Sequence, residues 1–174
     1  MYEVGDMILY NDIGVCRIAD IERRDFSGLE KGRLYYLLDP LYQNCRVAAP
    51  VDTTKVFMRP VISRDEVEKL IDQIPEIKGE SYYSRSPREL AEHYEYSMNT
   101  HDCTELIRLT KSIYMKKRDM ESRKKKFGAV DKKYMKRAED MLFGEFAAAL
   151  DIPKKDVPGY IKNKVETTEK NGVI

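Results

Sequence analysis

The sequence predicts an α+β protein, in which a small N-terminal β-barrel of the Tudor/SH3 type precedes an all-α helical domain. Two observations carry this prediction. Short segments rich in β-branched and aromatic residues, separated by turn residues, fill residues 1–60. Hydrophobic residues at helical spacing then run through most of residues 61–165. We therefore expect two domains with these bounds, followed by a flexible tail over residues 166–174.

Turn residues divide the first 60 residues into short strands. A turn containing Gly14 follows the first strand, and Gly28 and Gly32 permit the positive φ of a hairpin tip further along. Asp39 and Pro40 are expected to end the third strand. The predicted strands cover residues 7–10, 15–23, 34–38, 45–49 and 56–59. Five short strands in so few residues are typical of SH3- and Tudor-like barrels.

Capping patterns mark the beginnings of the predicted helices. Residues 63–66 read Ser-Arg-Asp-Glu and residues 86–89 read Ser-Pro-Arg-Glu, and both have the S-x-x-E form of a capping box. Asp102 is expected to cap the third helix and Asp131 the fourth, which Pro153 ends. A last short helix is predicted over residues 157–165.

The sequence gives no support for an enzyme. The three cysteines are far apart and fit buried hydrophobic positions in a reducing cytoplasm better than a zinc site or a disulfide framework. The two histidines, His93 and His101, lack a third metal ligand beside them. Neither a glycine-rich phosphate loop nor a local triad signature occurs. We therefore expect no catalytic residue, no metal and no cofactor.

The sequence also favours a protein that works away from membranes. No segment approaches the roughly 20 apolar residues that cross a bilayer. The first residues lack the basic and apolar regions of a signal peptide. We expect a cytoplasmic location, with neither a membrane partner nor a small-molecule substrate.

Charge is distributed unevenly along the chain. Residues 111–140 hold twelve Lys or Arg against five acidic residues, a net charge of +7, whereas residues 61–110 hold six against eleven, a net charge of −5. Clustered cations favour a nucleic-acid partner, because phosphates release condensed counterions when they are neutralised. A solvated, salt-bridged helix face is the alternative on charge alone.

The like-charge spacing of the fourth helix favours an anionic partner. Lys132 and Lys136, and likewise Lys133 and Arg137, are four residues apart, so each pair repels by a few tenths of a kcal/mol in an isolated helix. Sequences tend to break such local rules at functional sites. A second cluster, at residues 82–88, mixes tyrosines with arginines, and taken alone it fits a hydrophobic staple with solvated arginines better than a binding site.

Taken together, these segments resemble the CarD/CdnL family. The resemblance is spread over roughly residues 1–152 rather than concentrated in one motif. It is carried by residues 4–10, Gly14, residues 21–24 and 47–52, the stretch from Ala91 to Asp102, residues 105–114, and residues 132–150 with Ala138, Leu142, Gly144 and Glu145.

The resemblance implies a bacterial transcription regulator rather than an enzyme. In this family an N-terminal Tudor-like domain, which also occurs in transcription-repair coupling factors, docks on the β subunit of RNA polymerase. A C-terminal helical domain contacts promoter DNA at the upstream edge of the melting bubble and stabilises the open complex. Such a protein would associate with the nucleoid through polymerase. The first alternative is an RNA- or ribosome-binding protein with a Tudor-like barrel and basic helices. The second is a structural adaptor that makes no contact with nucleic acid, in which the basic segment is ordinary surface.

The resemblance also implies site residues, with two departures. Arg24 and Phe26 match the polymerase-binding edge, but the expected arginine of the neighbouring strand falls near Ala48, so Arg46 takes its place in our prediction. The family often has a wedge tryptophan at the first DNA-facing helix, and this chain has no Trp, which makes a nearby tyrosine the substitute. The predicted DNA-binding residues are Tyr83, Arg85, Arg88, Lys116, Lys117, Lys124, Lys125, Lys132 and Lys136.

Overall fold

The computed structural model describes residues 1–25, 27 and 31–171, with the side chains of residues 170 and 171 excepted. The chain forms two compact units, Met1–Ile62 and Ser63–Ile174. The sequence changes from strand-like to helical periodicity at Pro60, and the boundary between the units lies two residues later.

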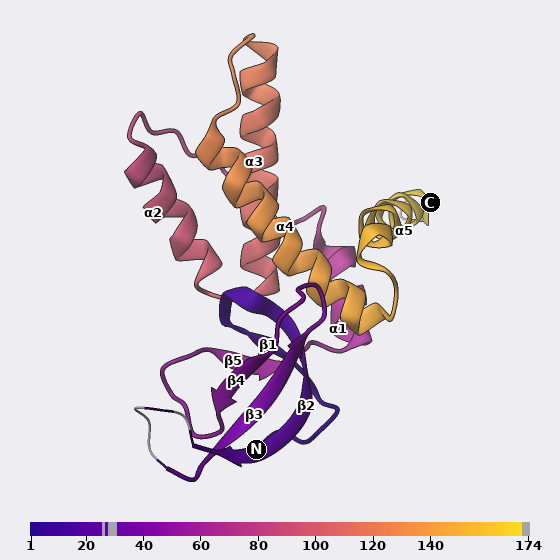
Figure 1. Cartoon of the computed structure of the whole chain (residues 1–174). Helices are drawn as coiled ribbons and strands as arrows, with labels where there is room; N and C mark the ends of the chain where they lie inside the picture. Colours follow the sequence, from indigo (N-terminus) through magenta and orange to yellow (C-terminus); the bar gives the residue numbers. More distant parts are fainter. Residues whose placement is uncertain (26, 28–30, 172–174) are drawn as a thin grey trace. The chain divides into compact units, whose positions relative to one another are not determined.

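The N-terminal unit is built on an antiparallel sheet of five strands in the order β4-β3-β2-β1-β5 (Figure 1). The α+β class and the five strands are therefore confirmed. Pairing between the edge strands β4 and β5 is not found among the described residues, so the sheet is open where a closed barrel was predicted. The strands are β1 (Met7–Tyr10), β2 (Gly14–Arg24), β3 (Arg33–Pro40), β4 (Val47–Pro50) and β5 (Met58–Pro60).

A β-bulge in β2 explains why the hydrophobic alternation of this strand is imperfect. The register with β3 shifts between Ile18 and Asp20. Before the shift Ile18 faces the core, and after it Ile21 packs against the same core although three positions separate the two. A bulge inserts one residue and so moves the following side chains to the other face.

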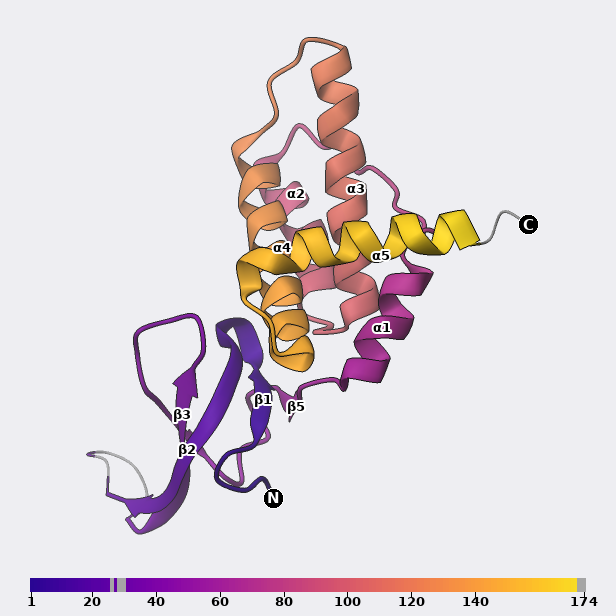
Figure 2. The same cartoon turned by 90° about the vertical axis from the view of Figure 1, so that its right-hand side faces the viewer.

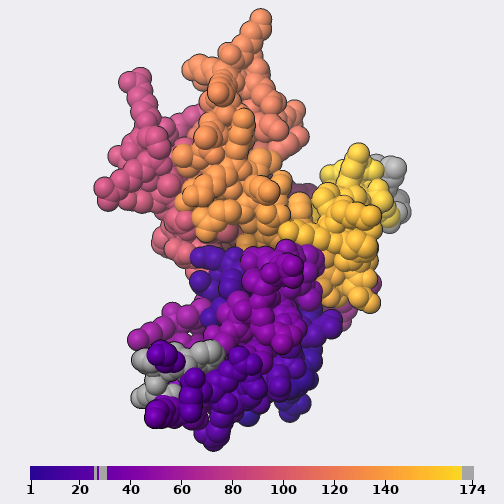
Figure 3. Space-filling view, viewed as in Figure 1, coloured from indigo at the N-terminus to yellow at the C-terminus, as the bar shows by residue number. Residues whose placement is uncertain are grey.

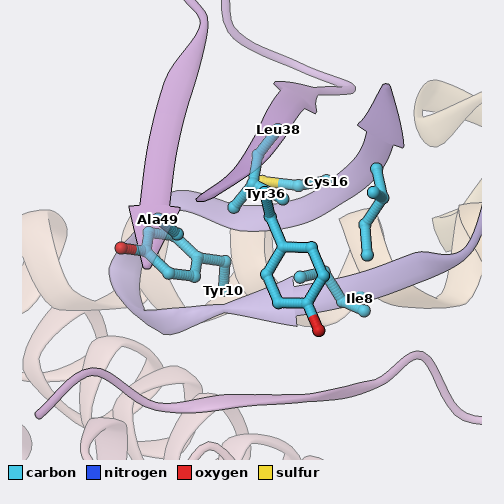
Figure 4. Close-up of a cluster of buried hydrophobic side chains, with 7 residues drawn as sticks. Ile8, Tyr10, Cys16, Tyr36, Leu38 and Ala49 are labelled. Carbon is cyan, nitrogen blue, oxygen red and sulfur yellow. The ribbon is translucent and has the colours of Figure 1, made fainter. Parts of the chain in front are cut away.

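The core of the N-terminal unit combines aliphatic and tyrosine side chains from four strands. Figure 4 shows Tyr10, Tyr36, Leu38 and Cys16 gathered over Ala49 and Ile8. The Tyr36 hydroxyl accepts a hydrogen bond of 2.9 Å from the backbone N–H of Tyr2, so the polar end of this buried ring is satisfied.

Several strand limits differ from the prediction; β5, for example, begins at Met58 rather than at residue 56. Asp39 and Pro40 belong to β3 and do not break it, because Pro40 is its last residue and pairs with Cys16 at the strand end. The fourth strand begins at Val47, so Cys45 and Arg46 lie in the preceding connection. Cys45 is also exposed, whereas Cys16 is buried as expected.

The helical unit contains α1 (Arg64–Gln73), α2 (Pro87–Met98), α3 (Cys103–Ser122), α4 (Ala129–Leu150), the short 3₁₀ helix η2 (Lys154–Asp156) and α5 (Val157–Asn171). The predicted caps of the first three helices are confirmed. Ser63 and Glu66 form a complete capping box, and the side chains of Ser86 and Asp102 accept hydrogen bonds from backbone N–H groups of α2 and α3.

The fourth helix begins earlier than predicted, and Asp131 is not its cap. The N-cap residue is Gly128, and Asp131 is buried in the first turn. A Cβ on Gly128 would lie 3.1 Å from Asp131 Oδ2, so glycine leaves room for the carboxylate. Asp131 is held in the interior by hydrogen bonds from Tyr94 of α2 and Lys116 of α3. The sequence around Asp131 does not reveal these partners.

The last helix is longer than predicted. It continues to Asn171 rather than ending at residue 165, so part of the segment expected to be a flexible tail is helical. Residues 172–174 of that tail lie outside the described residues. Figure 2 shows α5 crossing α4 toward α1. There Lys164 binds the Glu68 carboxylate and donates to the Glu68 carbonyl at 3.0 Å, which fixes α5 on α1.

Candidate functional surfaces

Arg24 and Arg46 are exposed residues of the N-terminal unit, and each is paired with an acid. Arg46 binds both oxygens of Asp39, at 2.7 and 3.0 Å, and remains 60% exposed. Arg24, at the end of β2, is paired with Glu22. The hydrogen bond from Arg46 lowers the pKa of the Asp39 carboxyl, and Glu22 also acts on the charge of Arg46. Each of the two predicted arginines thus has an acidic partner of its own.

The predicted polymerase-binding edge also includes Phe26, and the prediction assumed a strand position for Arg46. Phe26 lies outside the described residues. Arg46 precedes β4 and therefore lies outside the strand that was predicted to include it, over residues 45–49. Its exposure nevertheless leaves the guanidinium accessible, because both contacts with Asp39 lie at the surface.

The exposed lysines around the start of α4 form the surface that fits an anionic partner best. The C-terminal end of α3 and the connection to α4 project from the rest of the helical unit (Figures 1 and 3). Among the described residues, no acidic side chain lies within ion-pair distance of these lysines. We call this set the basic surface: Lys124, Lys125, Lys126, Lys132 and Lys136.

Other cations of the basic segment are already neutralised inside the unit. Arg137 lies 2.6 Å from the Glu95 carboxylate of α2, which also accepts from the Tyr134 hydroxyl at 2.7 Å. Burial alone would raise the pKa of Glu95, but these hydrogen bonds outweigh it and hold the pKa below its ordinary value. Arg123 pairs with Asp119. The like-charge repulsion inferred between Lys133 and Arg137 is therefore offset by an acid from another helix.

Lys116 is not a surface cation, which corrects its assignment as a phosphate contact. It is 4% exposed, and its Nζ lies 2.8 Å from Asp131 Oδ1. The Tyr94 hydroxyl donates to the same oxygen at 2.6 Å. Burial raises the pKa of Tyr94, and this hydrogen bond raises it further. We call Lys116, Asp131 and Tyr94 the buried triad; it joins α2, α3 and α4. Lys117, the next residue of α3, is half-buried.

Of the two candidate wedge tyrosines, Tyr83 is the more accessible. Its side chain is 52% exposed, and its hydroxyl donates to Asp119 at 2.6 Å, which raises the pKa of the phenol. Its ring faces the Lys116 ammonium, 5.1 Å from the ring centroid. Tyr82 is instead stacked on His93, with the ring centroids 3.8 Å apart. Of the two tyrosines, Tyr83 therefore has the more accessible ring.

The segment before α2 is held against α3. The Glu80 N–H donates to Ser112 Oγ at 2.9 Å, and a Cβ on Gly79 would lie 2.8 Å from the Ser112 nitrogen, so only glycine fits this approach. This contact helps to fix the position of Tyr83 and Arg85. Arg85 and Arg88 are both exposed, and Arg88 pairs with Glu92 one turn later on α2.

A cavity of about 340 Å³ opens beside Tyr83. Its walls include Pro87 and Leu90 of α2 and Met120 of α3, and the first turn of α4 closes one side. Lys116 and Asp131 of the buried triad form its polar part. Such a mostly apolar hollow with a few fixed polar groups is the usual form of a ligand site. The sequence analysis did not predict it, because its walls come from three helices.

The comparison with protein families assigns the N-terminal unit. Residues 2–62 match the model of the CarD-like/TRCF RID domain. This part of the chain is a CarD-like RID domain. The predicted resemblance to the CarD/CdnL family is thereby confirmed for the unit that the match covers. RID domains interact with the β subunit of RNA polymerase, so the match is consistent with a role in transcription regulation.

The chain as a whole has no match among curated proteins. Among the described residues, no helix is long and apolar enough to cross a membrane. No group of three or more potential metal ligands occurs within the same described part.

Proposed function

We propose that this protein is a transcription regulator that binds the RNA polymerase β subunit through its RID domain and contacts promoter DNA through its helical unit. It contacts the DNA at the upstream edge of the bubble and stabilises the open complex, and it acts as a binding protein without catalysis. The single observation that carries the proposal is the family match of residues 2–62. It gives the N-terminal unit a partner that is itself bound to promoters.

The basic surface supports the second half of the proposal. Its five exposed lysines have no acidic partner within ion-pair distance in the described part of the chain, so their charge is available to phosphates. Contacts of this kind fix position without reading sequence. Binding to polymerase raises the local concentration of DNA near the helical unit, so its own affinity for DNA need not be high.

Polymerase binding is tested with the full chain and purified β subunit. Arg24→Ala, Arg46→Ala and Phe26→Ala should each weaken the complex, whereas Lys55→Ala, an exposed change on the same unit, should not. Binding to ribosomes or RNA in the absence of any binding to polymerase would replace this proposal with the alternative function.

Open-complex stabilisation is tested by measuring the lifetime of a promoter complex. Tyr83→Ala should shorten this lifetime more than it weakens binding to closed duplex, because an aromatic ring acts on unstacked bases. Tyr82→Ala is the matched control, since Tyr82 is stacked on His93. If neither variant changes the lifetime, the bubble-edge role of this segment is wrong, while polymerase binding is unaffected by that result.

A further inference from the structure

We propose that the cavity beside Tyr83 holds a single unpaired nucleobase, which leaves the DNA stack and enters the protein. This inference rests on the proposed function, since it names the part of the DNA that the helical unit takes up. It differs from a wedge, because here the base moves to the aromatic ring and not the ring into the DNA.

The first support is that Tyr83 is held in place. Its hydroxyl donates to Asp119 at 2.6 Å, and one face of its ring lies against the Lys116 ammonium. A wedge must project between base steps, whereas a ring fixed at its hydroxyl and at one face serves as a wall. A base that stacks on such a wall gains about as much as it does on other aromatic platforms.

The second support is the size and lining of the cavity. Its volume of about 340 Å³ lies in the range of small-molecule sites and can accept one base. Proteins that take up a flipped base hold it between aromatic or apolar side chains. Tyr83 supplies the aromatic surface here, and Pro87, Leu90 and Met120 supply apolar ones.

The third support is a fixed hydrogen-bond donor in the cavity. A lysine ammonium has three N–H donors, and one of them is used on Asp131 Oδ1 at 2.8 Å. Because Tyr94 also binds that oxygen, the carboxylate and with it Lys116 cannot shift freely. A base with a keto oxygen can accept from this ammonium. Thymine, guanine and cytosine carry one, and adenine does not.

The surroundings of the cavity fit a nucleotide rather than a free small molecule. Arg85, which is exposed, lines it as well. Gly128 lies in its wall, and the Lys132 N–H bonds the Gly128 carbonyl at 3.1 Å, so Lys132 of the basic surface is one helical turn away. Cations at this position can hold the phosphates on either side of an extruded base.

The test compares three labelled duplexes of equal length, binding to the full protein, by fluorescence anisotropy. One is fully paired, one carries a single unpaired thymine, and one carries an abasic residue at the same bulge. We expect the thymine bulge to bind at least about fivefold more tightly than the other two, the gain of stacking one base on an aromatic ring. An adenine bulge should bind more weakly than the thymine bulge.

A variant that fills the cavity supplies the decisive comparison. Ala129→Leu places a larger side chain in the wall, at an exposed position in the first turn of α4. It should abolish the preference for the thymine bulge and leave binding to paired duplex within twofold. Ala148→Leu, at a partly buried position about 28 Å further along the same helix, is the control for a larger side chain on α4. Circular dichroism verifies that both variants fold.

The outcomes separate this inference from the proposed function. If Ala129→Leu keeps the preference, or if the abasic bulge binds as tightly as the thymine bulge, the base pocket is overturned while DNA binding stands. Equal binding of adenine and thymine bulges would overturn the role of Lys116. If the protein binds none of these DNAs at any salt concentration, the proposed DNA contact itself fails.

Discussion

The two candidate binding surfaces of this protein, one on each unit, differ in how their charges are paired. On the N-terminal unit the arginines predicted to bind polymerase are paired with neighbouring acids, Arg24 with Glu22 and Arg46 with Asp39. On the helical unit the basic surface has no such partners within the described residues. Paired charges form a defined pattern that suits one protein partner, whereas unpaired lysines suit any phosphate backbone. The difference shows why net charge alone is a poor guide to function.

A substitution in the buried triad should change stability more than any other, because Lys116 is a basic residue buried inside the helical unit. Lys116→Ala leaves Asp131 buried without its cation, and removing one partner of a buried ion pair typically costs about 3–5 kcal/mol. We expect a loss of this size in the free energy of unfolding, measured with urea. Lys125→Ala, at the exposed surface, should change it by less than about 0.5 kcal/mol. Equal effects would mean that Lys116 is not the buried partner.

Charge reversal on the basic surface sharpens the comparison. Lys125→Glu combined with Lys132→Glu should weaken binding to all duplexes similarly. The slope of log K against log salt is negative, and its magnitude should decrease by about 2, because each phosphate that is no longer neutralised releases about one counterion fewer. Lys155→Glu with Lys162→Glu changes the net charge equally on exposed residues outside the basic surface. If both double variants behave alike, only total charge matters and the basic surface is not a defined site.

Substitution of a paired arginine of the N-terminal unit should have a smaller effect, on binding to polymerase and not on stability. Arg46→Ala is expected to reduce affinity for the β subunit at least about fivefold, as interface arginines often do. The midpoint of thermal unfolding should hardly move, because an exposed ion pair contributes about 0–1 kcal/mol. A large fall in this midpoint together with unchanged affinity would assign Arg46 to stability instead.

The smallest expected effect concerns acid. Burial alone would raise the pKa of Glu68, but hydrogen bonds from Lys164 and Tyr160 outweigh it and lower the pKa. A carboxyl with a lowered folded pKa stabilises the fold above its unfolded pKa, about 4.3, and this contribution is lost as pH falls through the folded value. Glu68→Gln should therefore lower the urea midpoint at pH 7 and flatten its fall between about pH 5 and 3. Glu76→Gln, at an exposed position, should not.

Local signals in the sequence were sufficient for most of the elements. Strand positions in the N-terminal unit followed from β-branched residues and turns, and the caps at Ser63, Ser86 and Asp102 marked three helix beginnings correctly. Each of these signals acts within a few residues of the element it specifies. The closed barrel did not follow, because closure depends on pairing between the first and last strands of the sheet, which no local pattern encodes.

The charges divide in the same way between sequence and tertiary structure. The sequence by itself determined that residues 111–140 are basic and that a tyrosine pair precedes the second helix. Only tertiary structure decided that Lys116 is buried while Lys125 is exposed, because the partner of Lys116 is Asp131, fifteen positions away on another helix. Tertiary structure likewise brought Tyr83 beside that ion pair and formed the cavity between three helices. A lysine ammonium can be buried only where the fold places an opposite charge beside it. Which acid lies there is decided by the packing of the helices and not by neighbours in the sequence.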